Sequence, residues 1–476
     1  MILLVAGFLV MTAVAAVEFV QLQVANDRIE ELEDQVGGGG GDGDGLFGEI
    51  GDALEDLLGN LGEELGGLEG LPAADLLQCL EAGPPPQEAA PGGGVGGQVD
   101  AVARSVEQIR ELRFEQPVRP TFLSADRTAD RVRETFLSEY NPSLADREQR
   151  VLIALGAIPA GTDLRQLRAE ALGREVIGFY DPETGELVVK SGGPELGAFE
   201  RVTLAHELEH ALADQRLGIP LPDDITAGSE DRDLAALAVV EGDATLTMQR
   251  YSTTLSPGEQ IELIDPEAVA EAEASLAKLP HFLQRELLFP YEEGLNFVCR
   301  LYAAGGWESV NAAYDQPPES SDEILFPDRY VEGIAPVDPA DPPGPGSGWR
   351  PAARYQLGAA HLLWLFEAPG GDPSRAVGDA QARVSAWAGG EIHLWTQGAD
   401  SALSVIVAER SGKDDLCGSV QEWYGASFGD DTEDSAAGRV TFDGPDQDAV
   451  LACAPDEIRL GIGPDVRTAQ SLTTAS

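Results

Sequence analysis

The sequence predicts an α+β protein that is predominantly helical, with a small sheet beside one central helix and a membrane-spanning helix at the N-terminus. Three observations predict this class. Apolar residues recur at helical spacing through much of the chain after residue 98. Two short β-type runs flank a turn-forming cluster at residues 181–185. The first 24 residues are almost entirely apolar.

The N-terminal run is uninterrupted from Met1 to Val17, and its apolar character continues past Glu18 to Val24. This continuation favours an uncleaved anchor (residues 1–24) over a signal peptide that ends near residues 13–15. The following segment is net acidic, so the rest of the chain is expected outside the cell membrane. A single-pass protein with an extracytoplasmic body is the first prediction, and secretion after cleavage is the alternative.

Composition divides the remainder into three parts. Residues 25–97 are acidic and rich in glycine and proline, which predicts a spacer. Residues 98–350 have globular patterning, and residues 351–476 are expected to close a cleft against them and to end in an acidic tail. The net charge of −52, from 83 acidic and 31 basic residues, repels phosphate backbones, so nucleic acid is excluded as a partner.

The elements follow from periodicity and turn residues. Three early helices are expected, at residues 102–112, 127–139 and 147–155. Strands are expected at 175–180 and 186–190, joined by the turn at 181–185. Later come helices at 233–248, 355–366 (holding His361) and 414–424, and strands at 391–394 and 403–407.

The most specific motif is His206-Glu207-Leu208-Glu209-His210. Histidines four residues apart lie on one face of a helix, where both imidazoles reach a common zinc ion. Glu207 is then placed to take a proton from a zinc-bound water. An apolar stripe of flanking residues predicts a half-buried helix that ends before Gly218, whereas the alternative is a surface helix with two solvated histidines.

A catalytic zinc needs a third protein ligand. Glu241 lies within the apolar stretch 233–248, and a buried carboxylate without a partner is costly, so a cation is expected beside it. His206, His210 and Glu241 are therefore the predicted ligands of one zinc ion per chain. The alternative places Glu241 on a solvated edge of its helix.

The HExxH run followed by Glu241 in a second helix resembles the gluzincin metallopeptidases, the thermolysin-like group. Further short segments, such as Gly178–Pro182, Val240–Ala244 and Phe289–Tyr291, resemble those of an uncharacterised bacterial group of predicted metallopeptidases. The resemblance covers roughly residues 98 to 410. One departure is that the second helix lacks the acidic residue four positions after Glu241.

This resemblance implies a zincin-like domain, with a small sheet above the helix that carries the histidines, and hydrolysis of a peptide or protein substrate with Glu207 as general base. The edge strand of such a sheet binds the substrate backbone, which would place Val188 and Lys190 near that edge. Tyr291 is the first candidate to stabilise the oxyanion. The alternative is a catalytically inactive zinc-binding surface scaffold, although the intact Glu207 favours an enzyme.

The four cysteines show no C-x-x-C spacing, which argues against a cysteine zinc site. Export would permit disulfides, and Cys417 and Cys453 flank an acidic stretch that closure would stabilise, so a bridge between them is expected. Cys299 lies in an apolar helix and is expected to be a buried thiol, whereas Cys79 lies in the spacer.

Overall fold

The computed structural model describes residues 79, 94–191, 195–220, 229–263, 266–410, 416–429, 431–434 and 439–474. The expected membrane helix (1–24) and nearly all of the spacer (25–97) lie outside these residues. Among the described helices, none combines the length and the apolar character needed to cross a membrane.

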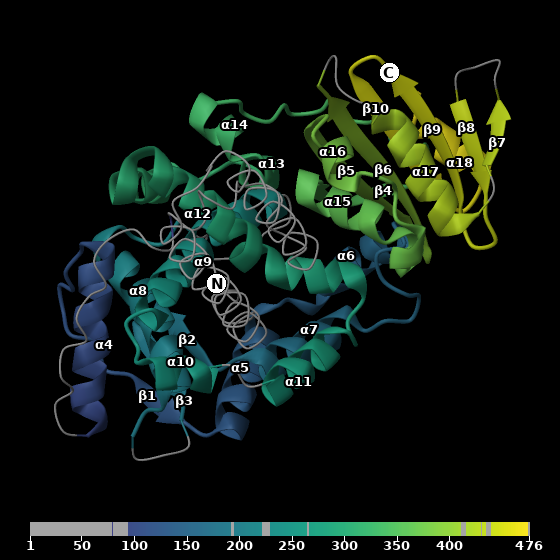
Figure 1. The fold of residues 1–476 in the computed structure, drawn as a ribbon. Helices are drawn as coiled ribbons and strands as arrows, with labels where there is room; N and C mark the ends of the chain where they lie inside the picture. Colours follow the sequence, from purple (N-terminus) through teal and green to yellow (C-terminus); the bar gives the residue numbers. More distant parts are fainter. Residues whose placement is uncertain are drawn as a thin grey trace, which may run out of the picture.

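The protein is a mixed α/β structure in which helices predominate (Figure 1). Residues 95–332 contain most of the helices and a small sheet, and the C-terminal part is built around a larger sheet with further helices. The helices are α4 (Val95–Arg110), α5 (Ala125–Glu139), α6 (Pro142–Ala154), α7 (Leu164–Glu175), α8 (Ala198–Arg216), α9 (Glu230–Ser252), α10 (Pro257–Leu263), α11 (Pro266–Leu276), α12 (His281–Asp315), α13 (Ser321–Leu325), α14 (Pro327–Glu332), α15 (Ala359–Glu367), α16 (Ala380–Val384), α17 (Leu416–Phe428) and α18 (Val466–Ser471). The strands are β1 (Thr121–Leu123), β2 (Gly178–Asp181), β3 (Glu186–Lys190), β4 (Arg350–Gln356), β5 (Trp387–Gln397), β6 (Asp400–Glu409), β7 (Asp431–Asp434), β8 (Arg439–Asp443), β9 (Asp448–Ala454) and β10 (Glu457–Gly463).

Helices α8, α9 and α12 form the centre of the helical part. α8 is buried from Arg201 to Ala213 and α9 from Leu234 to Ser252, so neither is a half-buried surface helix. A helix that is buried on all sides must sit in the core of a protein, because it has no face for water. The predicted zinc helix is therefore more deeply enclosed than its amphipathic pattern indicated.

The small sheet has the strand order β1-β3-β2 and lies against α8. The expected hairpin is confirmed, because β2 pairs antiparallel with β3 and Phe179 faces Val188. β3 is not an edge, however: β1 pairs with it in parallel, with Thr121 opposite Val188 and Leu123 opposite Lys190. The expectation that Val188 and Lys190 lie near a free edge is therefore wrong, because a three-residue strand from far upstream covers it.

The larger sheet has the order β4-β5-β6-β10-β9-β8-β7 and is antiparallel throughout. The strands expected at 391–394 and 403–407 are parts of β5 and β6. The helix expected at 355–366 begins only at Ala359, because Tyr355 pairs with Ile392 as part of β4. The acidic stretch from Asp430 to Asp448, which Cys417 and Cys453 flank, contains β7 and β8.

Two disulfides join distant parts of the chain. Cys417 and Cys453 are bonded, as predicted, with 6.2 Å between their Cα atoms. Cys299 is not a free thiol, because it is bonded to Cys79 across a sequence separation of 220. The carbonyl oxygen of Cys79 also accepts hydrogen bonds from Nε and Nη2 of Arg250, at 3.1 and 2.6 Å. This point of the spacer is thus fixed to both α9 and α12.

Candidate metal centre

The helix α8 presents both histidines toward α9. It begins at a glycine whose backbone N–H donates to the Glu200 carboxylate at 2.9 Å, and it ends where Gly218 adopts a φ of 78°. Between these ends His206 and His210 are separated by four residues, so both rings lie on the same face. The rings meet edge to face, with centroids 4.6 Å apart.

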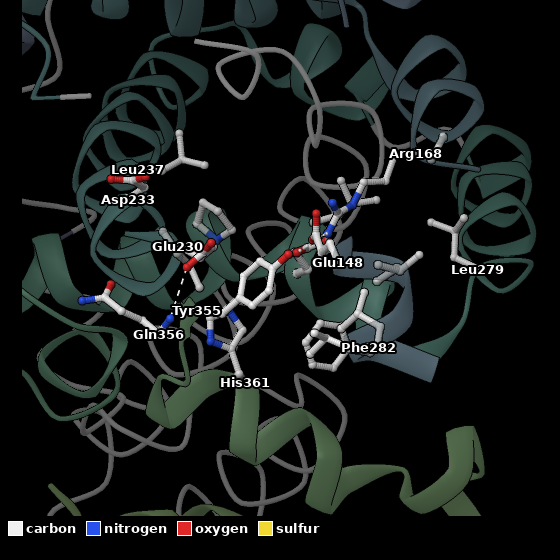
Figure 2. Close-up of a pocket in the computed structure, with 18 of the residues that line it drawn as sticks. Glu148, Arg168, Glu230, Asp233, Leu237, Leu279, Phe282, Tyr355, Gln356 and His361 are labelled. Atoms are coloured by element: carbon white, nitrogen blue, oxygen red, sulfur yellow. Dashed lines mark hydrogen bonds and ion pairs between the residues drawn. The ribbon is translucent and has the colours of Figure 1, made fainter. Parts of the chain in front are cut away.

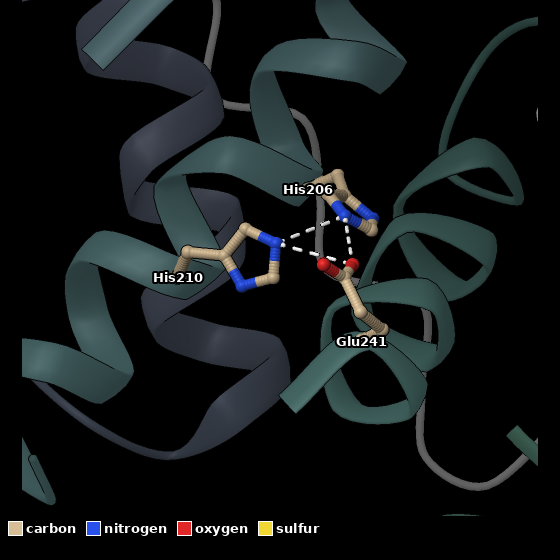
Figure 3. A group of neighbouring side chains, drawn as sticks. All are labelled: His206, His210 and Glu241. Atoms are coloured by element: carbon tan, nitrogen blue, oxygen red, sulfur yellow. Dashed lines mark hydrogen bonds and ion pairs between the residues drawn. The ribbon is translucent and has the colours of Figure 1, made fainter. Parts of the chain in front are cut away.

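Glu241 projects from α9 between the two rings (Figure 3). Its Oε2 atom lies 3.1 Å from Nε2 of His206 and 3.4 Å from Nε2 of His210, and the two Nε2 atoms are 3.0 Å apart. All three side chains are buried. The structure thus brings together the three residues that the sequence assigned as ligands.

The donor set fits zinc. Two imidazoles and one carboxylate are a common ligand set of catalytic zinc sites, with metal–ligand distances of about 2.0–2.2 Å. In a tetrahedral site such distances place neighbouring ligand atoms about 3.3–3.5 Å apart, close to the 3.0–3.4 Å separations observed. Hydrogen bonding alone explains the cluster less fully, because a hydrogen on only one Nε2 leaves the other Nε2 and the Glu241 oxygen facing each other as two acceptors.

Burial and the interactions among these side chains determine their protonation. Burial lowers the pKa of His206 to about 4, which keeps the imidazole neutral, as a metal ligand must be. Burial acts to raise the pKa of Glu241, but interactions with His210 and His206 outweigh it and hold that pKa at about 2. A charged Glu241 carboxylate facing a neutral His206 imidazole is a protonation state in which both groups can bind a divalent cation.

Glu207 lies on the side of α8 that faces the small sheet. A Cβ atom added to Gly178 of β2 would lie 3.0 Å from Cγ of Glu207, so the glycine makes room for this side chain. Glu207 is buried, and burial raises its pKa well above the ordinary value, with the nearby Glu241 charge adding to the shift. A carboxyl group with a raised pKa is suited to exchanging protons near neutral pH.

Tyr291 of α12 stacks on His206, with ring centroids 6.2 Å apart and planes inclined by 25°. It therefore lies beside the candidate centre, where the sequence resemblance placed a possible oxyanion donor. Its position follows from a close crossing of α9 and α12. A Cβ on Gly242 would lie 2.2 Å from the carbonyl oxygen of Gly294, three residues after Tyr291.

A buried network of charged residues lies next to the candidate metal centre. The sequence did not predict this network. Arg110 of α4 lies 3.3 Å from Oε1 of Glu209 and donates to Oδ2 of Asp243 at 2.9 Å. Asp243 also accepts a hydrogen bond from the Tyr314 hydroxyl at 3.0 Å, and the Arg110 guanidinium stacks on Trp307 at 4.0 Å.

This network is linked to the metal ligands because its acidic residues are close to the ligands in sequence. Glu209 precedes His210, and its Oε2 atom lies 3.9 Å from His210 Nδ1. Burial raises the pKa of Glu209 and Asp243 adds to the shift, although Arg110 opposes it. Acidic residues inside otherwise apolar helices were the available sign of this network. Nothing in the sequence identified Arg110 as their partner.

A second group of possible ligands lies in the C-terminal part, at Asp341, Glu391 and His393. Here a cation is already present, because Arg354 donates to Oε1 of Glu391 at 2.9 Å and lies 3.8 Å from Asp341. Asp341 is also exposed. Among the described residues, the histidines of α8 with Glu241 are therefore the stronger candidate for a metal.

No family model matches the chain, and neither the curated proteins nor the solved structures contain a detectable relative.

Proposed function

We propose that this protein is a zinc-dependent peptidase with a zincin-like arrangement, in which His206, His210 and Glu241 hold one zinc ion and Glu207 is the general base. The observation that carries the proposal is the convergence of the three ligand atoms within 3.0–3.4 Å of one another, next to a buried glutamate. The small sheet beside α8 agrees with a zincin-like architecture.

The zinc ion, when bound, would supply a Lewis acid that polarises the scissile carbonyl and makes water more acidic. Glu207 takes one proton from the attacking water as its oxygen bonds to the carbonyl carbon. The C–N bond then breaks, and Glu207 returns the proton to the leaving nitrogen. Tyr291 is the proposed donor of a hydrogen bond to the developing oxyanion, and the stacking of its ring on His206 supports this role.

The proposed location is outside the cytoplasmic membrane, with residues 1–24 as the anchor or, alternatively, as a cleaved signal peptide. All four cysteines are paired in disulfides. Disulfides persist in oxidising compartments and are rare in the cytosol, so they support export. The expected substrate is a peptide or protein.

A zinc-binding protein without turnover is the second candidate, and burial of the site favours it. His206, Glu207, His210 and Glu241 are each at most 2% exposed. A substrate reaches such a centre only when neighbouring elements move apart. A structural site, in contrast, needs no access.

Hydrolysis of a broad peptide library by the full-length protein separates the two candidates. We expect cleavage by the zinc-loaded wild type and loss of at least ~100-fold in rate for Glu207→Gln, because a general base contributes about this much. The matched control is Glu200→Gln, which changes a glutamate at the start of the same helix and away from the ligands. Cleavage by wild type and Glu207→Gln at equal rates would remove Glu207 as the base, and absence of cleavage by any zinc-loaded form would favour the binding protein.

A further inference from the structure

A cavity of about 220 Å³ lies where α6, α7, α9, α12 and α15 meet (Figure 2). Its walls are mainly leucine and aromatic side chains, among them Leu237, Phe282 and Tyr355. Protein interiors rarely contain voids larger than a water molecule. A cavity of about 150 Å³ is enough to hold benzene, so this one has room for a larger ring or an aliphatic chain.

The charged groups at one end of the cavity satisfy one another. Arg168 donates to both carboxylate oxygens of Glu286, at 2.8 and 2.9 Å, and lies 2.7 Å from Glu148. Its other terminal nitrogen donates to the Tyr140 hydroxyl at 2.9 Å. Because the guanidinium already has two carboxylate partners, a bound molecule does not need an acidic group to satisfy it.

The overall charge of the cavity wall disfavours an anion. Four acidic residues line the cavity, at Glu148, Glu230, Asp233 and Glu286, whereas Arg168 is the one arginine or lysine in its wall. His361 also lines it, but its Nδ1 accepts a hydrogen bond from the Gly358 N–H at 3.1 Å, and burial lowers its pKa to about 4. The histidine is thus neutral, and a carboxylate inside the cavity would face an excess of like charge.

We propose that this cavity is a binding site for one uncharged apolar chain or ring, and that it rejects anionic ligands of the same size. Two of its walls adjoin the candidate metal centre. Tyr291 lines the cavity and stacks on His206, and Leu237 lies one helical turn before Glu241. An apolar group held here therefore lies next to the metal ligands.

Titration of the full-length protein with octan-1-ol and with octanoate tests the proposal, by calorimetry and by saturation-transfer NMR. We expect one saturable octan-1-ol site per chain and octanoate binding at least ~10-fold weaker, because the anion meets like charges. Equal affinity for the two ligands, or no saturable binding of octan-1-ol, would overturn the proposal.

Substitutions locate the site. Ala171→Leu places a larger side chain on the cavity wall and is expected to weaken octan-1-ol binding by ~10-fold or more, since the added atoms occupy ligand space. Ala303→Leu makes the same change on the exposed side of α12 and should leave binding unaltered. Unaltered binding to Ala171→Leu would show that octan-1-ol binds elsewhere and would contradict the assignment.

A charge variant tests the selectivity separately. Glu286→Gln removes one carboxylate while Glu148 still pairs with Arg168, so octanoate should bind several-fold more tightly and octan-1-ol should be unaffected. No gain for octanoate would reject the electrostatic part of the proposal. Octan-1-ol contains no peptide bond, so these results are independent of whether the protein hydrolyses peptides.

Discussion

Gly242 and Gly294 bring α9 and α12 into backbone contact directly beside the candidate metal centre. A Cβ atom on Gly242 would lie 2.2 Å from the Gly294 carbonyl oxygen, and one on Gly294 would lie 2.2 Å from the Ala238 carbonyl oxygen. Glu241 precedes the first glycine and Tyr291 precedes the second by three residues. The crossing therefore sets the distance between a proposed ligand and the aromatic ring that stacks on His206.

Gly242→Ala should force these helices apart. We expect a loss of about 1–3 kcal/mol in the free energy of unfolding, as for other overpacked cores, together with weaker zinc binding. Gly96→Ala is the control, because no atom lies within 4 Å of the added Cβ and alanine favours a helix. Chemical denaturation and zinc titration measure both effects, and a variant as stable as wild type would show that the crossing tolerates a side chain.

Arg110→Met tests the buried charge network. The substitution leaves Glu209 and Asp243 buried without their cation, so we expect destabilisation by about 3–5 kcal/mol. Zinc affinity should fall about 10–100-fold if Glu209 orients His210. Arg113→Met removes an exposed pair with Glu107 and should cost at most about 1 kcal/mol. Equal effects of the two variants would show that the network does not support the centre.

Asp231 predicts a specific dependence of stability on pH. It lies near the start of α9, where its Oδ2 accepts from the Ser321 N–H at 3.1 Å and Oδ1 lies 3.8 Å from His361. Burial raises its pKa from 3.8 to about 7. The folded state binds this proton more tightly than the unfolded state does, so protonated Asp231 increases the free energy of unfolding. This contribution is fully present below about pH 4 and is lost as pH rises through 7.

Asp231→Asn mimics the protonated side chain at every pH. We therefore expect the variant and the wild type to be similarly stable at pH 4, and the variant to be more stable at pH 8, by up to about 4 kcal/mol for a shift of this size. Urea unfolding at both pH values measures the difference. A variant that is less stable than wild type at pH 8 would contradict the shift.

The two disulfides should contribute unequally. The loop-entropy relation gives about 5 kcal/mol for Cys79–Cys299 and about 4 kcal/mol for Cys417–Cys453, because the first closes a much longer loop. Paired serine substitutions of each bridge, compared by thermal unfolding, test this order. A larger loss from removing Cys417–Cys453 would reject it.

The sequence predicted those features of the structure that depend on the spacing of residues close together in the chain. The histidine pair, the helix that carries Glu241 and the β2–β3 hairpin all follow from patterns within about 20 residues. The contacts that it missed join distant segments: β1 covers β3, Cys79 binds Cys299, and Arg110 pairs with Glu209 and Asp243. None of these partners has a local pattern that identifies the other.

Tyr355 shows a different kind of error. Its apolar neighbours continue the helical pattern of α15, but pairing with Ile392 draws residues 350–356 into the larger sheet. Tertiary pairing thus overrode local propensity.

The most direct test of the account is the metal content and zinc coordination of the full-length protein, measured by elemental analysis and X-ray absorption on wild type and Glu241→Ala. We predict one zinc per wild-type chain, with two imidazole nitrogens and a carboxylate oxygen at about 2.0–2.2 Å and no sulfur ligand. Glu241→Ala should lose most of this zinc. Full zinc retention by Glu241→Ala, or a wild-type protein that binds no zinc, would contradict the assignment of His206, His210 and Glu241 as the metal centre.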